Sequence, residues 1–248
     1  MQEIEKIVSF LRDRFAKANI QTAVVAVSGG IDSAVSLSLT VRALGVDHVI
    51  PVLLPYANQN MDDAKTICAW NSIPHEHWLE LNIKKTVDTV ASQLRISSSE
   101  ELRRGNIMAR TRMIVVYDTA KAANALVVGT ENKSEHYLGY FTRFGDAASD
   151  IEPICHLYKT QIRELARELG IPQQIISKSP SAGLWKNQTD EDELGFTYED
   201  ADKVLQQYID KKKKPSTIQI EGISKETVQR VIAKVEENKF KLEVPYSL

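Results

Sequence analysis

One stretch near the N-terminus constrains the fold of this chain more than any other. The β-branched apolar run from Ala23 to Val27 passes directly into a Ser-Gly-Gly turn at residues 28–30, and helix-forming residues follow within three positions. This pattern is typical of a buried strand, a tight turn and a helix. The first N–H groups of such a helix lack partners within it, so the turn is suited to bind an anion. Asp32 adds a carboxylate, and the sequence therefore predicts a loop that binds phosphate and Mg²⁺.

The loop differs from the two common nucleotide-binding motifs. Residues 28–33 contain no lysine, as the Walker pattern requires, and the nearest match elsewhere, Gly129–Ser134, lacks the second glycine. Ser-Gly-Gly-x-Asp-Ser does not fit Gly-x-Gly-x-x-Gly either. It resembles the pyrophosphate loop of the N-type ATP pyrophosphatases, which split ATP between the α and β phosphates and adenylate a substrate. The plain alternative is a glycine-rich turn without a ligand.

Length and charge limit the classes of protein to consider. The chain has 248 residues, and 31 Lys and Arg against 33 Asp and Glu give a net charge of −2. We expect a single domain over residues 1–248, with neither nucleic acid nor a membrane as partner. The first residues lack the basic and apolar regions of a signal peptide. Cys68 and Cys155 form no CxxC pair, and free thiols favour a cytoplasmic location.

Strand and helix patterns alternate along the chain. Apolar runs predict strands at residues 23–27, 48–54, 73–81 and 125–130, and helical periodicity predicts helices at 4–18, 33–44, 60–71, 86–94, 106–121, 160–169, 198–209 and 225–237. We therefore expect an α/β fold with a doubly wound, mostly parallel sheet and helices on both faces. His75 and His77 would share one strand face, but no third ligand at zinc-like spacing accompanies them, and we interpret them as structural or surface residues.

Acidic residues follow the fourth predicted strand. Ligands of open α/β sheets bind beyond the carboxyl ends of the strands, and Thr130, Glu135 and Asp146 come after that end. Hard cations prefer oxygen ligands beside substrate phosphates, so Asp32, Glu135 and Asp146 are candidate metal ligands. Glu135 also fits a simpler role, as an acid favoured in the first turn of a helix.

Arg110 lies on an otherwise apolar stripe of the helix predicted over residues 106–121, together with Ile107, Ile114 and Tyr117. An unpaired buried arginine is costly, so its guanidinium must reach solvent or a negative partner. The spacing leaves two partners open: a bound phosphate or carboxylate, or an aspartate across a subunit interface.

A longer series of motifs carries a specific resemblance. The chain resembles the ammonia-dependent NAD synthetases over nearly its whole length, which implies a Rossmann-like fold of the adenine nucleotide α-hydrolase type. The matching motifs are Val24–Ser33, Gly105–Met113, Val128–Thr130, Glu135, Gly139–Asp146, Asp150, Lys159, Lys178–Trp185 and Gln188–Gly195. The first loop alone would indicate only the superfamily.

The resemblance implies roles for individual residues. ATP would contact the first loop and three later positions, namely Ala26, Val27, Ser28, Gly29, Gly30, Ile31, Asp32, Ser33, Thr130, Lys159 and Ser181. Asp32 and Glu135 would ligate Mg²⁺, with Asp146 near a second ion. Deamido-NAD would contact Arg110, Arg143, Asp150, Asn238 and Lys239. Asp32, Lys159 and Asp146 would act in catalysis.

Three positions depart from the usual family pattern. Ala147 and Ala148 replace glycines, which restricts φ in the loop before Asp150. Arg143 stands where lysine is common. At the tail, Asn238-Lys239 takes the place of a usual His-Lys pair.

By the same resemblance, the carboxylate of deamido-NAD attacks the α-phosphorus of ATP, pyrophosphate leaves, and ammonia converts the adenylate to NAD and AMP. The polar loop over residues 178–194, which contains Trp185, is the expected lid against water. A glutaminase would need its own domain of on the order of 100 residues, so ammonia is the expected nitrogen donor. Family members are usually homodimers, and we expect one here.

Two alternatives come from other classes of protein. One is a tRNA-modifying ATP pyrophosphatase that adenylates a base, which would share only the first loop and which neither the charge balance nor the cysteines support. The other is a nucleotide-binding module without catalysis, which would leave Glu135, Asp146 and Lys159 without a role.

Overall fold

The computed structural model describes residues 1–97, 99–181, 183–185 and 188–246. Within these residues, one sheet of four strands has the order β3-β2-β1-β4, with β1 at Thr22–Ala26, β2 at Val49–Leu53, β3 at Leu79–Glu80 and β4 at Ala125–Val128. Every pairing is parallel, and Val24 of β1 lies between Ile50 and Val127. The strand order reverses between β1 and β4, which is where ligands bind in doubly wound sheets.

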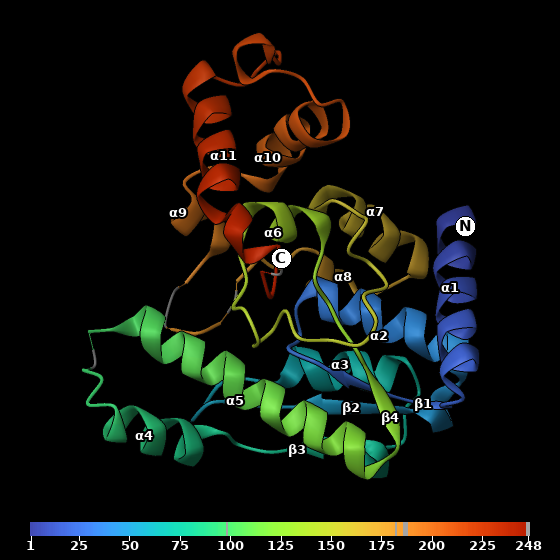
Figure 1. The fold of residues 1–248 in the computed structure, drawn as a ribbon. Coiled ribbons are helices and arrows are strands. Elements are labelled where there is room, and N and C mark those ends of the chain that lie inside the picture. Colours follow the sequence, from blue (N-terminus) through green and yellow to red (C-terminus); the bar gives the residue numbers. More distant parts are fainter. Residues whose placement is uncertain (98, 182, 186–187, 247–248) are drawn as a thin grey trace.

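Helices cover both faces of this sheet (Figure 1). On one face pack α1 (Gln2–Ala18), α2 (Ile31–Leu44), α3 (Asp62–Trp70) and α7 (Lys159–Leu169). On the other pack α4 (Lys84–Gln93) and α5 (Glu101–Ala122). Ala23 and Val25 of β1 belong to the first core and Val24 to the second, so the strand is buried on both sides. This confirms the predicted α/β fold and explains the unbroken apolar run.

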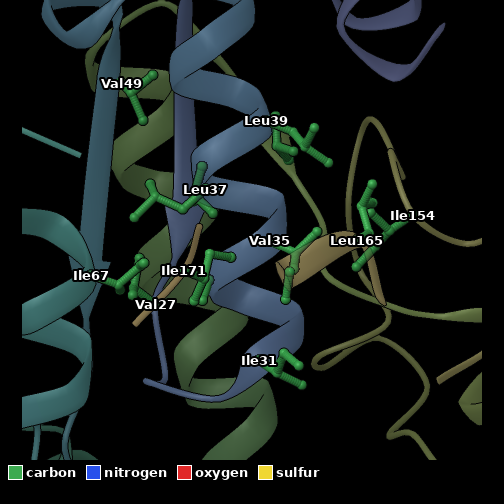
Figure 2. Packing of buried hydrophobic residues seen from close by; sticks show 14 of the residues in the cluster. Val27, Ile31, Val35, Leu37, Leu39, Val49, Ile67, Ile154, Leu165 and Ile171 are labelled. Carbon is green, nitrogen blue, oxygen red and sulfur yellow. The ribbon is translucent and has the colours of Figure 1, made fainter. Parts of the chain in front are cut away.

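Helix α2 lies at the centre of the larger core, and all of its residues from Ser33 to Thr40 are buried. Figure 2 shows Leu37 of this helix on the side of Val49 and Ile67, and Val35 on the side of Leu165. Close packing of this kind leaves little freedom to shift, so the N-terminus of α2 is held firmly at the end of β1.

A second group of helices lies beyond the sheet, at the top of Figure 1. It consists of α6 (Lys133–Leu138), α9 (Asp190–Leu194), α10 (Tyr198–Leu205) and α11 (Lys225–Asn238). Leu138, Tyr198 and Val231 belong to its own apolar core. Because α7 contacts α10 as well as α2, we propose that residues 1–248 form one domain.

The strand predicted over residues 73–81 is wrong for most of its length. Pro74 has no N–H to donate to a ladder, and a 3-10 turn follows it at His75–His77. The chain reaches β2 only at Leu79–Glu80, so His75 and His77 do not share a strand face. The other predicted elements are present with shifted ends.

Several short elements were not predicted by periodicity. They are α6, α8 (Gln173–Ile176), α9, and 3-10 turns at Val46–His48, Pro215–Thr217 and Lys239–Lys241. The helix predicted over residues 198–209 is formed by α10 and a π-helical turn at Gln206–Asp210. Among the described residues, no helix has both the length and the apolar character needed to cross a membrane.

Candidate active site

The phosphate-binding loop predicted from the sequence connects β1 to α2. Gly29 has a φ of 82°, and a Cβ at this position would lie 2.9 Å from both Ala64 N and Asp63 Cβ. The Ser28 hydroxyl accepts a hydrogen bond from the Gly30 N–H at 3.2 Å and lies 3.2 Å from the Ser33 hydroxyl. The first N–H groups of α2 have no partner within the helix, and its dipole adds positive charge. The loop can therefore surround an anion with backbone donors.

Lys159, the first residue of α7, joins the two principal acidic residues. Its Nζ donates to Asp32 Oδ2 at 2.5 Å and to Glu135 Oε1 at 2.9 Å. The lysine side chain is 2% exposed, and the two carboxylates are 16% and 17% exposed. Three residues from α2, α6 and α7, each of which was a candidate site residue, thus meet at the end of the phosphate loop.

The charges in this cluster depend on one another. Burial raises the pKa of Glu135 above its ordinary value, although the attraction of Lys159 acts in the opposite direction. Burial also opposes the charge of Lys159, but the attraction of Asp32 and Glu135 outweighs it, and the pKa of the lysine lies above its ordinary value. The ammonium is therefore charged, and it compensates a group of carboxylates that would otherwise be costly to bury.

The sequence did not indicate the residues that support this cluster. Asn132, which is fully buried, donates from Nδ2 to Asp32 Oδ1 at 2.9 Å. The Ser134 hydroxyl accepts from the Lys159 N–H and donates to Asp202, and Asp202 also accepts from the Thr160 N–H. A weak signal for Asn132 exists in the sequence, because asparagine three residues before a glutamate is typical of a helix start.

Asp146 lies near Glu135 at a small cavity. The two side chains line a small cavity of about 40 Å³ together with Thr130, Glu131 and Phe141. Asp146 Oδ1 accepts a hydrogen bond from the Thr142 N–H at 3.0 Å. The structure therefore places Thr130, Glu135 and Asp146 around one small space.

The donor set fits a hard cation that arrives with a nucleotide. No three His, Cys, Asp or Glu side chains within the described residues are grouped as a complete metal site. Mg²⁺, however, is usually held by one or two carboxylates together with substrate phosphates. Asp32 and Glu135 already converge on one cation, the ammonium of Lys159, so their oxygen atoms suit this mode of binding.

Comparison with known proteins establishes the family. The family model for NAD synthase matches residues 3–245. The chain belongs to the NAD synthase family. An NH(3)-dependent NAD(+) synthetase from Thermococcus kodakarensis is 42% identical over 98% of this chain and 94% of the relative. The enzyme of the same name from Chlorobium phaeovibrioides is 44% identical over 98% of this chain and 88% of the relative.

Two solved structures share the fold of this NAD synthase family member. An NMN synthetase from Francisella tularensis has a TM-score of 0.85 and 31% identity, and covers 100% of this chain and 97% of its own. An NH3-dependent NAD synthetase from Campylobacter jejuni, in complex with nitrate, has a TM-score of 0.82 and 29% identity, with coverages of 100% and 98%.

Residues expected to contact the second substrate form a separate group. The guanidinium of Arg110 is exposed and donates from Nε and Nη2 to the Arg143 carbonyl, both at 3.3 Å. The guanidinium carbon of Arg143 lies 5.5 Å from the ring centre of Phe144 and 5.9 Å from that of Phe240. Asp150 Oδ2 accepts from the Val127 N–H at 2.8 Å. The structure thus brings Arg110 and Arg143 together, two of the residues expected to contact the dinucleotide.

The tail approaches this group through Asn238, which was expected, and through Lys241, which was not; a Cβ on Gly139 would lie 2.2 Å from Asn238 Cβ. Lys239 pairs with Glu236 at 2.5 Å, and Asn238 donates to the Lys234 carbonyl. Lys241, which was not singled out from the sequence, donates from Nζ to the carbonyls of Gly139 at 2.6 Å and Phe141 at 3.2 Å. Lys241 therefore anchors the loop that carries Arg143 and Asp146.

The predicted lid over residues 178–194 is partly described. Residues 182, 186 and 187 lie outside the described residues. The Ser181 hydroxyl donates to the Gln188 carbonyl at 2.7 Å and accepts from the Gly183 N–H at 3.1 Å, both within the loop. Leu184 packs against Gly105 of α5, where a Cβ would lie 2.9 Å from Leu184 Cδ1. This part of the chain therefore rests on α5.

Proposed function

We propose that this protein is an ATP-dependent ligase that amidates deamido-NAD with ammonia, giving NAD, AMP and pyrophosphate. The observation that carries the proposal is the meeting of Asp32, Glu135 and Lys159 at the end of the phosphate loop. Relatives above 40% identity that are named NH(3)-dependent NAD(+) synthetases support the choice of reaction.

The proposed reaction has two steps. An oxygen of the deamido-NAD carboxylate attacks the α-phosphorus of ATP, and the bond to the bridging oxygen breaks to release pyrophosphate. Ammonia then attacks the carbonyl carbon of the adenylate, AMP leaves with the bonding electrons, and the surplus proton passes to solvent. Lys159 and the N–H groups at the start of α2 offset the charge that builds on the phosphates.

The acidic residues are the proposed ligands of the metal ions that neutralise the phosphate charge. Asp32 and Glu135 would hold Mg²⁺, with Asp146 near a second ion, and the metal would neutralise the phosphate oxygens. Thr130 lines the same cavity as Glu135, and we assign it, the residues of the loop from Ala26 to Ser33, and Ser181 to the ATP site.

The dinucleotide site is proposed from Arg110, Arg143, Asp150, Asn238 and Lys239. The contact of Arg110 with the Arg143 backbone supports a shared role for these two residues. We also propose a homodimer, because members of this family are usually homodimers and because α5, the helix of Arg110, exposes two large apolar side chains, Leu102 at 66% and Ile114 at 61%. A cytoplasmic location is proposed because Cys68 and Cys155 are both free thiols.

One observation favours a second candidate substrate. The Francisella tularensis structure with a TM-score of 0.85 is named an NMN synthetase, so the acceptor could be the corresponding mononucleotide. The two acceptors can be compared by their specificity constants with ATP and an ammonium salt. We expect a preference for deamido-NAD, and a preference for nicotinate mononucleotide would move the assignment to the second candidate.

The reaction type is tested by product analysis. With α-labelled ATP we expect AMP and pyrophosphate, formed only when the acceptor is present. The Asp32→Asn variant should bind deamido-NAD as the wild type does and release no pyrophosphate. ADP and orthophosphate as products, or efficient use of glutamine by the pure chain, would refute the proposal.

A further inference from the structure

Asn132 occupies a buried position between the two acidic residues of the site. Its Nδ2 donates to Asp32 Oδ1 at 2.9 Å, across 100 positions of sequence. Its Oδ1 accepts from the Glu135 N–H at 3.0 Å, which caps the first turn of α6. The side chain is 0% exposed, so water cannot replace either of these hydrogen bonds.

Capping alone does not require an amide. Thr197 and Ser224 cap α10 and α11 with a hydroxyl that accepts from the N–H three residues later. Asparagine at the same place in α6 does this with one half of its amide and leaves a donor for a second partner. That donor is directed to a carboxylate of the site, not to its own helix.

The two bonds permit one orientation of the amide. If it were flipped, the carbonyl oxygen would face the Asp32 carboxylate and the NH₂ group would face the Glu135 N–H. Acceptor would then meet acceptor and donor would meet donor, and unmade hydrogen bonds in a buried place are costly. The orientation of Asn132 is therefore determined by its surroundings, and it determines in turn which oxygen of Asp32 remains for a cation.

Asp32 divides its two oxygens accordingly. Oδ1 is held by Asn132, and Oδ2 lies 2.5 Å from the ammonium of Lys159. Glu135 reaches the same ammonium through Oε1 from a helix whose start Asn132 caps. One amide thus sets the rotamer of the first carboxylate and the place of the second.

We propose that Asn132 is a positioning residue for the adenylation reaction, which holds Asp32 and Glu135 at the separation that nucleotide-bound metal requires. This inference rests on the proposed function. Partners that orient metal ligands typically contribute 10–100-fold to metal affinity or activity.

The test compares two variants that keep the cap. In Asn132→Ser the hydroxyl still caps α6 but is too short to reach Asp32. In Asn132→Asp an oxygen still caps α6, but an ionised carboxylate has no hydrogen to donate. Ser224→Ala removes an exposed cap from α11 and serves as the control for loss of a helix cap. Mn²⁺ is the probe, titrated by electron paramagnetic resonance with a non-hydrolysable ATP analogue present.

For both variants we expect Mn²⁺ affinity and the rate of pyrophosphate release to fall about 10–100-fold. The affinity for deamido-NAD should remain close to the wild-type value in both variants. Their melting temperatures should fall by about 2–10 °C, because a buried hydrogen bond is lost, and both should be fully folded at the assay temperature. Ser224→Ala should lower the melting temperature by about 2–4 °C through its lost cap and leave the other three quantities at their wild-type values. In the Asp32→Asn background, Asn132→Ser should cause no further loss of Mn²⁺ affinity, because the two residues act as one unit.

Wild-type Mn²⁺ affinity in both variants would show that Asn132 is a cap and nothing more. The proposal would also be overturned if the fraction of unfolded protein at the assay temperature accounted for the whole loss of Mn²⁺ affinity. Failure of the proposed function would look different, since the wild type would then release no pyrophosphate while the Mn²⁺ titrations still report on Asn132.

Discussion

The ammonium of Lys159 lies 2.5 Å from Asp32 Oδ2, although 127 positions separate the two residues in the sequence. The same ammonium lies 2.9 Å from Glu135 Oε1. A positive charge of the protein itself therefore stands between the two carboxylates that would bind metal with ATP. Metal without a nucleotide must compete with this lysine.

Replacing Lys159 by methionine tests this competition. We expect pyrophosphate release to fall by about 100-fold or more, because a charge that stabilises the transition state is lost. Binding of Mn²⁺ in the absence of nucleotide should instead strengthen about tenfold, since two buried carboxylates lose their counter-charge. Lys65→Met, which removes an exposed ion pair with Glu80, is the control. Equal Mn²⁺ affinity in Lys159→Met and the wild type would contradict this account of the site.

Gly29→Ala tests the close approach in the phosphate loop. Gly29 and Gly222 have nearly the same φ, 82° and 79°, but a Cβ at Gly222 meets nothing within 4 Å. Gly222→Ala should therefore cost about 1 kcal/mol in the free energy of unfolding, from the left-handed backbone alone. Gly29→Ala should cost about 2–4 kcal/mol, because overpacking against Asp63 and Ala64 is added, and it should weaken ATP binding more than tenfold. Urea unfolding and nucleotide titration measure the difference, and equal losses in the two variants would be incompatible with the prediction.

The raised pKa of Glu152 predicts that the free energy of unfolding depends on pH. Its carboxylate fills the space beside Gly129, where a Cβ would lie 1.8 Å from Oε1, and burial raises its pKa to about 8. Because this pKa exceeds the unfolded value, near 4.5, the contribution to stability is complete below about pH 4.5 and is lost as the pH rises to 8. The loss is on the order of 4–5 kcal/mol, because each unit of difference between the two pKa values corresponds to about 1.4 kcal/mol.

Glu152→Gln should remove this pH dependence, because the amide can still accept from the Glu131 N–H and donate to Ser149. Above pH 8 the variant should be more stable than the wild type in urea unfolding, and near pH 4.5 the two should be similar. Glu164→Gln, at an exposed position of α7, is the control. A wild-type stability that does not fall between pH 5 and 8 relative to Glu152→Gln would exclude the raised pKa.

Two lysines of the tail can be distinguished by substitution. Lys241 holds the carbonyls of Gly139 and Phe141, whereas Lys239 is 65% exposed and pairs with Glu236. Lys241→Met should raise the KM for deamido-NAD about tenfold, because the loop that carries Arg143 loses its anchor. Lys239→Met should have a smaller effect. A larger rise in KM for Lys239→Met than for Lys241→Met would indicate that Lys239 is the tail residue that contacts deamido-NAD.

Local sequence patterns predicted much of the fold because they depend on short-range chemistry. The apolar run before Ser28 and the periodicity of α2 and α5 each reflect burial along a single element. Pro74 shows the limit, since the alternation after it suggested a strand, but the geometry of proline produced a 3-10 turn and left β3 at Leu79–Glu80.

The sequence by itself determined the parallel sheet and the turn from β1 into α2, and through the family motifs it proposed Asp32, Glu135 and Lys159 as site residues. Only the tertiary structure decided that Lys159 bridges the two carboxylates, that Asn132 orients Asp32 and that Lys241 holds the neighbouring loop. The physical reason is range. A helix or strand forms from neighbours in the chain, whereas these contacts join residues 24 to 127 positions apart, on different elements. Which residues become partners depends on how the layers of the fold pack against each other, and the local periodicity of the sequence does not contain that information.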